Sequence, residues 1–144
     1  MWIIFEGLDK TGKTTLEWEL LKATNFKHIV IDRGPAGYAT FDKILNRETP
    51  SGVSNFIKQA REIMELDSMV VYCKANEQVV NQRLKDHNEK QLDSGWPYEN
   101  MQELYERNVH LFYDSRNVLV LDTSDKTIPQ CIKIIKNRIE EVKR

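Results

Sequence analysis

Several features that mark specialised classes of protein are scarce in this sequence. It has only two cysteines, Cys73 and Cys131, and neither has a neighbour at metal-ligand spacing, which favours two reduced packing thiols over a disulfide or a metal site. No apolar run is longer than about five residues, so no segment is long enough to span a bilayer. The formal net charge is only −1, which argues against a general binder of nucleic acid. Because the sequence opens on a strand pattern rather than on a signal peptide, we expect a cytoplasmic protein with no membrane partner.

The composition that remains is that of an ordinary globular protein. With 144 residues, of which 40% are hydrophobic and 30% charged, the chain is long enough to bury a core and short for two typical domains. No internal repeat or low-complexity linker interrupts it. We therefore expect a single domain over residues 1–144.

Apolar periodicity alternates between strands and helices along the whole chain. Four short apolar runs predict buried strands at residues 2–5, 28–31, 69–73 and 118–121. Apolar residues at helical spacing predict helices at 13–23, around 38–45, after 51–52, after a cap at Asn76, from about 101 to 112, and at 128–142. Buried strands separated by helices imply an α/β fold with a parallel sheet and right-handed crossovers.

The segment after the first strand carries the clearest motif. Gly7–Thr14 reads GLDKTGKT and fits the phosphate-loop pattern G-x-x-x-x-G-K-[ST] between a strand and a helix. Gly7 and Gly12 permit positive φ, so successive backbone N–H groups can converge on one anion at the N-terminus of the helix. Lys13 is placed to reach the β- and γ-phosphates, and the Thr14 hydroxyl to bind Mg²⁺. The alternative is a Gly-rich turn with a solvated lysine.

With this loop, the expected architecture is a three-layer α/β/α P-loop fold with a mostly parallel, four- to five-stranded sheet. Ligands of such sheets bind at the carboxyl ends of the strands, so residues 6–14, 32–33, 74–76 and 122–124 should converge on one crevice. The residues expected to bind the donor nucleotide are Gly7, Leu8, Asp9, Lys10, Thr11, Gly12, Lys13, Thr14 and Thr15.

A second motif follows the next apolar strand. An apolar strand that ends in an aspartate is typical of a Walker B element, so Asp32 is expected beside Thr14, where the two would hold Mg²⁺ directly or through water. The adjacent Arg33 has a planar, permanently charged guanidinium that suits a transferred or accepting phosphate. In the alternative interpretation, Asp32 caps the turn and Arg33 pairs with it on the surface.

Together these motifs resemble the thymidylate kinase family of P-loop nucleoside and nucleotide kinases. The resemblance is most specific over residues 5–15, FEGLDKTGKTT, and extends to the Asp32-Arg33 pair. Weaker landmarks lie at 70–72, at 83–84 and at 121–123. The family implies ATP as the phosphoryl donor, Mg²⁺ as the metal, and a small nucleotide as the acceptor; many of its members form homodimers.

The same resemblance implies roles for individual residues. Asp9 would face the acceptor sugar or hydroxyl, and Lys10 stands where one branch of the family has a catalytic arginine, with the charge kept and the fork lost. Arg83 would begin a basic lid over the ATP phosphates with Lys85 and, more weakly, Lys90; the alternative is the solvated end of a helix. Glu6 would order a Mg²⁺-bound water or an acceptor hydroxyl, or else be a carboxylate held by backbone amides. The expected catalytic residues are Lys13, Asp32, Arg33, Asp9 and Arg83.

One departure from the family bears on the acceptor. Thymidylate kinases are longer and place a strand and helices that recognise the acceptor monophosphate between the first helix and the Asp-Arg strand. Here only residues 25–27 separate the two, so the chain resembles a shortened member. Without that strand, the expected order across the sheet is second, first, third, fourth in chain order.

Three functions follow from these observations. The leading one is ATP-dependent phosphorylation of a nucleotide, with a deoxynucleoside monophosphate as the first choice of acceptor. The second is a kinase that phosphorylates a hydroxyl on DNA, RNA or a modified base, in which Trp96, Tyr98 and Tyr105 would stack bases, although core packing of these aromatic residues is favoured. The third is an ATP-binding module without turnover.

Overall fold

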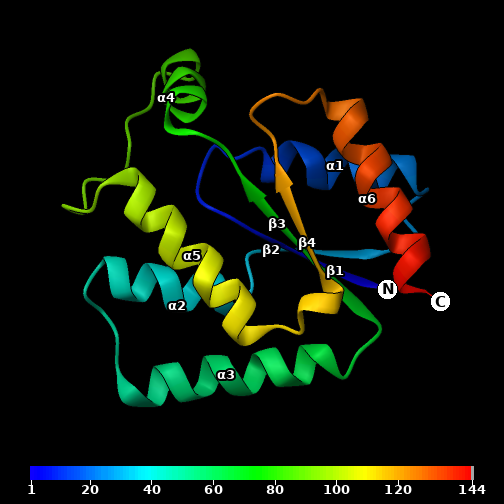
Figure 1. Ribbon diagram of the computed structural model, residues 1–144, viewed down its shortest axis with the longest axis horizontal. Helices are drawn as coiled ribbons and strands as arrows, with labels where there is room; N and C mark the ends of the chain where they lie inside the picture. The colour runs from blue at the N-terminus through cyan, green and yellow to red at the C-terminus, as the bar shows by residue number, and fades with distance from the viewer. Residues whose placement is uncertain (144) are drawn as a thin grey trace.

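The computed structural model describes residues 1–143, which form a parallel sheet with helices on both faces (Figure 1). Across the described residues the sheet has four strands in the order β2-β1-β3-β4, all parallel. The expected α/β class and strand order are confirmed, and the fifth strand that the expectation allowed is absent from residues 1–143. The strands are β1 (Trp2–Glu6), β2 (Ile29–Asp32), β3 (Ser68–Lys74) and β4 (Val118–Asp122).

The helices lie in two layers (Figure 1). Helices α1 and α6 pack against each other on one face of the sheet, and α2, α3 and α5 cover the other. Helix α4 follows β3 at the carboxyl end of the strands. None of the helices in the described part of the chain is long and apolar enough to cross a bilayer. Their bounds are α1 (Lys13–Ala23), α2 (Pro35–Ile44), α3 (Pro50–Met64), α4 (Glu77–Asp86), α5 (Tyr98–Phe112) and α6 (Ile128–Val142).

Because side chains alternate along a strand, the sheet supplies two separate cores. Ile3 and Phe5 of β1 face α1 and α6, where they meet Leu20 and Ile135, and all four side chains are fully buried. Ile4 of β1 faces the opposite way, into the second core.

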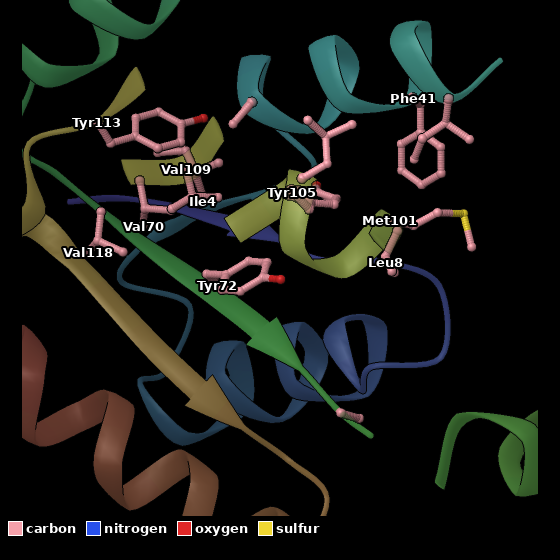
Figure 2. Packing of buried hydrophobic residues seen from close by; sticks show 14 of the residues in the cluster. Ile4, Leu8, Phe41, Val70, Tyr72, Met101, Tyr105, Val109, Tyr113 and Val118 are labelled. Atoms are coloured by element: carbon pink, nitrogen blue, oxygen red, sulfur yellow. The ribbon is translucent and has the colours of Figure 1, made fainter. Parts of the chain in front are cut away.

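Aromatic side chains dominate the second core, between the sheet and α5 (Figure 2). Tyr72 of β3 lies against Tyr105 of α5 with ring centroids 5.6 Å apart, and Phe41 of α2 meets the same ring edge-on at 6.1 Å. Tyr98 and Tyr105 are only 4% and 0% exposed, which confirms that these aromatic residues are core. They are therefore not free to stack on the bases of a nucleic acid.

Local capping explains where several helices begin. The Asn76 side chain accepts a hydrogen bond from the Val79 amide, as predicted for the start of α4. Thr127 and Gln130 form a reciprocal capping box at the start of α6. Helix α3 has the expected apolar stripe, but only Ala60 of it is fully buried.

Candidate active site

The phosphate loop leaves β1 at the carboxyl edge of the sheet and runs straight into α1. Gly7 has φ +140°, and a Cβ at this position would lie 2.3 Å from the carbonyl oxygen of Cys73, so no other residue fits there. Gly12 has φ +97° and Lys10 φ +63°, both in the left-handed region. Inside the loop the Thr11 hydroxyl donates to the Leu8 carbonyl at 2.7 Å. The motif thus adopts the tight, positive-φ turn that the sequence predicts.

A cavity of about 440 Å³ opens beside this loop. The loop and the start of α1 form one wall; α4 with the residue after it, the segment that follows β4, and the start of α6 form the others. Its size suits a nucleotide, and its loop wall is the positive N-terminus of a helix. The lining residues are Asp9, Lys10, Gly12, Lys13, Thr14, Thr15, Leu16, Arg83, His87, Glu89, Thr123, Lys126, Ile128 and Cys131.

Six of the nine residues predicted to bind the donor nucleotide line this cavity, and three do not. The Leu8 side chain belongs to the core on the α5 side, where it faces Met101 (Figure 2). Gly7 and Thr11 are buried beneath the loop. These three residues support the conformation of the loop and do not form part of the cavity wall.

Lys13, which lines the cavity, lies beside Asp32 at the end of β2. The Lys13 Nζ lies 3.9 Å from Asp32 Oδ1; the lysine side chain is 7% exposed and the aspartate 58%. Thr14, the next residue of α1, is exposed. The predicted convergence of the loop with the end of β2 is therefore present in the structure.

The oxygen donors at this point fit magnesium better than zinc. Magnesium takes only one or two protein oxygens and completes its shell with phosphate and water. Thr14 and Asp32 offer a hydroxyl and a carboxylate, and no group of three His, Cys, Asp or Glu side chains within residues 1–143 is arranged to hold a metal alone. The donor set therefore matches a metal that arrives with a nucleotide.

Glu17 is a member of this cluster that the sequence reasoning missed. It lies one turn after Lys13 on α1 and is 9% exposed. Burial, followed by contact with the Asp32 carboxylate, raises the pKa of Glu17 to about 8, and the charge of Lys13 opposes the shift. In the sequence it is only a polar residue on a helix, and its burial depends on β2.

On the other side of the loop, Asp9 pairs with Arg33. The Arg33 Nη2 donates to Asp9 Oδ1 at 3.3 Å, and the guanidinium carbon lies 4.1 Å from the centre of the Phe41 ring. Arg33 itself has φ +66°, a left-handed conformation directly after β2. The side chain is thus held between the loop and α2, and it does not pair with Asp32.

Glu6 anchors the segment that carries Arg33. Its fully buried carboxylate accepts hydrogen bonds from the Gly34 amide at 2.9 Å and the Gly37 amide at 3.2 Å. The hydroxyls of Tyr105 and Tyr113 donate to it at 2.8 and 2.7 Å. Burial raises the pKa of Glu6, and these hydrogen bonds oppose the rise. Of the two interpretations of Glu6, the structure supports the carboxylate held by backbone amides.

A smaller cavity of about 70 Å³ lies next to the Asp9 side of the loop. Asp9 and Glu89 line both cavities, and the Lys10 Nζ pairs with Glu89 Oε1 at 3.1 Å. The two cavities therefore meet at the tip of the phosphate loop. The remaining residues that line the smaller cavity are Leu8, Phe41, Val80, Leu84, Lys90, Gln91, Leu92, Tyr98 and Met101.

The three basic residues of the expected lid have different surroundings. Arg83 is partly buried: its Nη1 donates to the Lys10 carbonyl at 2.8 Å and its Nη2 to the Thr123 carbonyl at 3.2 Å. Lys90 lines the smaller cavity, and Lys85 is exposed and lines neither. Arg83 is thus bonded to the loop and is not a solvated helix end.

Other cavity residues gave only a weak signal in the sequence. Thr123 follows β4 at the predicted crevice, so its place was expected although its hydrogen bonds were not. His87, Lys126 and Ile128 lie on no recognised motif, and only the fold brings them to the cavity. Cys131 is a free, buried thiol, as expected, and also forms part of the wall.

No protein-family model matches the chain, and no curated protein matches its sequence. Solved structures do match its fold. The YorR protein from Bacillus subtilis, solved in complex with phosphorylated GDP, shares 17% identity at a TM-score of 0.75 over 97% of this chain and 96% of that chain. Thymidylate kinase from Candida albicans shares 14% identity at a TM-score of 0.60 over 99% and 92% of the two chains. Deoxyadenosine kinase from M. mycoides, solved with dCMP and dCDP, shares 17% identity at a TM-score of 0.60 over 98% and 100%.

These likenesses confirm that the chain has the fold of the thymidylate kinase-like P-loop kinases, as its motifs indicated. The match to YorR spans nearly the whole of both chains.

Proposed function

We propose that this protein is a phosphotransferase that moves the γ-phosphoryl group of a nucleoside triphosphate, with ATP as the first choice, onto a nucleotide. The leading acceptor is a deoxynucleoside monophosphate. The observation that carries the proposal is the meeting of two sets of groups at the loop tip: Lys13 with Asp32 on the donor side, and Asp9 with Arg33 on the other. Solved nucleotide and nucleoside kinases with the same fold support it.

On the donor side, the loop amides and Lys13 would bind the β- and γ-phosphates. Lys13 is almost fully buried, so its charge acts in a region of reduced dielectric, where it stabilises developing charge more than a solvated lysine does. Thr14 and Asp32 would hold Mg²⁺. When bound, that ion would neutralise phosphate charge.

On the acceptor side, the planar guanidinium of Arg33 would bind the acceptor phosphate, and Asp9 would orient the acceptor sugar. A monophosphate needs no general base because its attacking oxygen is already anionic. A nucleoside hydroxyl must lose a proton, and Asp9 or Asp32 would accept it. Loss of either carboxylate should therefore matter more for phosphorylation of a nucleoside than for phosphorylation of a monophosphate.

A deoxynucleoside is the second candidate acceptor, because deoxyadenosine kinase shares the fold. A polynucleotide is less supported, since Tyr98 and Tyr105 are buried and bonded to Ala75 and Glu6. The homodimer that the resemblance implies, and the catalytic roles of Lys10 and Arg83, stay predictions.

The test is a transfer assay with γ-labelled ATP and, separately, γ-labelled GTP. The acceptors are the deoxynucleoside monophosphates, GMP, GDP, the deoxynucleosides and a single-stranded oligonucleotide. Label on a mononucleotide supports the proposal. Label on a nucleoside or an oligonucleotide would keep the phosphotransferase activity and show that the acceptor is not a nucleotide. Tight Mg²⁺-dependent ATP binding without any labelled acceptor would favour the binding module without turnover.

A further inference from the structure

Two carbonyl groups of the phosphate loop have dedicated partners from distant parts of the chain. The Lys10 carbonyl accepts from Arg83 Nη1 at 2.8 Å, and the Thr11 carbonyl accepts from the Thr123 hydroxyl at 2.7 Å. Arg83 belongs to α4, and Thr123 directly follows β4. The loop is therefore tied from outside at two successive peptide units.

The two partners are themselves joined. The same Arg83 Nη1 donates to the Thr123 hydroxyl oxygen at 3.2 Å, and Nη2 donates to the Thr123 carbonyl at 3.2 Å. The Thr123 amide is fixed by the Lys74 carbonyl at 2.8 Å, and the residue is only 4% exposed. The one hydrogen of this hydroxyl is within reach of two carbonyl oxygens, that of Thr11 at 2.7 Å and that of Lys74 at 3.3 Å, and the shorter contact favours Thr11. The buried hydroxyl thus joins the loop to Arg83.

Peptide geometry gives these bonds a consequence for anion binding. In a planar trans peptide, the C=O and the next residue's N–H point in opposite directions. Holding the Lys10 carbonyl toward α4 turns the Thr11 N–H away from α4, and holding the Thr11 carbonyl toward Thr123 turns the Gly12 N–H away from Thr123. Convergent N–H groups of this kind form an anion-binding nest.

We infer that Thr123 and Arg83 are positioning residues, which act on the donor phosphates through the backbone of the phosphate loop. The inference rests on the proposed function for its ligand, a nucleoside triphosphate. It assigns Arg83 a different task from the catalytic one that the family resemblance implies, because the guanidinium nitrogens that carry the observed bonds are directed at backbone oxygens.

The test compares binding of Mg²⁺-ATP with binding of inorganic tripolyphosphate by calorimetry. Thr123→Val removes the hydroxyl and nearly keeps the shape. We expect the affinity for both ligands to fall by about tenfold, the order expected for one buried hydrogen bond. Thr123→Ser, which restores the hydroxyl, should bind both to within about threefold of the wild type.

The matched control is Ser68→Ala at the opposite end of β3. The buried Ser68 hydroxyl also donates to a backbone carbonyl, that of Ile63 at 2.8 Å, so its loss removes the same kind of bond away from the loop. This variant should keep wild-type affinity for both ligands. Thermal melting shows whether each variant is folded.

Arg83→Lys gives a second test, on a helix surface, should Thr123→Val fail to fold. It keeps the positive charge and loses the fork that reaches both carbonyls, so affinity for tripolyphosphate should fall severalfold.

Wild-type affinity in this variant or in folded Thr123→Val overturns the inference. A loss of affinity confined to ATP also overturns it, because the effect would then lie on the nucleoside. A wild-type protein that binds neither ligand removes the proposed function and the inference with it. Normal binding by the wild type and all variants removes the inference alone.

Discussion

The proposed donor side and the proposed acceptor side of the site are built in different ways. The donor side is mainly one continuous stretch, Gly7–Thr15, whose backbone amides and Lys13 follow from the local sequence. The acceptor side is assembled from three separate elements: Asp9 in the loop, Arg33 after β2 and Phe41 in α2. The backbone that follows its key residue, Arg33, is anchored by the buried carboxylate of Glu6.

This difference indicates which substitutions should impair each side. Backbone amides are present whatever the side chains, so the donor side should depend on its glycines, on Lys13 and on whatever holds the loop in shape. The acceptor side should depend on tertiary contacts, because Arg33 has a left-handed backbone that its surroundings must maintain. Changes on one side should leave binding on the other side intact.

The largest expected effect is on the donor side. Lys13→Ala should lower kcat by on the order of 10²-fold or more, because it removes a buried, preorganised charge from the transferring phosphoryl group. Steady-state kinetics of the purified variant measures this. Lys22→Ala is the control, since Lys22 lies at the far end of the same helix and pairs with Glu19 there. Intact turnover by a folded Lys13→Ala protein would exclude the loop from the mechanism.

The next effect is on the anchor of the acceptor side. Glu6→Gln should lower the free energy of unfolding by roughly 3 kcal/mol, because a neutral amide replaces a carboxylate with four donors and directs its own N–H at one of them. Urea denaturation measures it, and exposed Glu62→Gln should change stability little. A Glu6→Gln protein as stable as the wild type would contradict the anchoring role.

A smaller effect is expected at the acceptor-binding side chain itself. Arg33→Lys keeps the charge but loses both the fork and the flat contact with Phe41, so kcat/KM for the acceptor should fall by on the order of tenfold. The dissociation constant for Mg²⁺-ATP should not change. Arg47→Lys, at a surface pair with Asp42, is the control. Weakened ATP binding in Arg33→Lys would show that the two sides are not separable.

The last effect concerns pH and the buried Glu17. The pKa of Glu17 is raised to about 8 in the folded protein. Between the ordinary glutamate pKa and pH 8, the native state therefore keeps a proton on Glu17 that the unfolded chain has released. The stability that Glu17 contributes is therefore complete at low pH and is lost as pH rises to about 8, at no more than about 1.4 kcal/mol per pH unit.

Glu17→Gln removes the titrating group. The difference in free energy of unfolding between the wild type and this variant should therefore change between pH 5 and about pH 8. Urea titrations at several pH values measure the difference, and groups common to both proteins cancel. Glu19→Gln, two positions along the same helix, should give a constant difference. Parallel curves for Glu17→Gln would mean that Glu17 is ionised like an exposed glutamate.

The parts of this molecule that could be predicted from sequence are those encoded locally. Helix α1 begins and ends where its apolar spacing placed it, and Asn76 caps α4 through its own neighbouring amide. The strand order followed from the family resemblance together with one short connection, residues 25–27, which leaves no room for the family's additional strand. Parallel topology then brought the strand ends together, which is why Asp32 could be expected beside the loop.

What the sequence could not supply are side-chain contacts between distant segments. The environment of Glu17 is set by β2, and the partner of Lys10, Glu89, is 79 residues away. Leu8 has the spacing of a loop residue, yet its apolar side chain is more stable in the core than against phosphates. Such contacts depend on the packed backbone, and no local period or motif records them.

The central place of β1 also bears on how the protein is made. The strand and its loop are translated before the residues that fix the loop's carbonyls, which come 73 and 112 positions later, at Arg83 and Thr123. A nascent chain that has not yet reached Thr123 carries the motif without the network that shapes it. Folding should therefore be governed by contacts far apart in sequence, which slows it. The phosphate loop, although it is made before its partners, would become able to bind a nucleotide only after they have been made and packed against it.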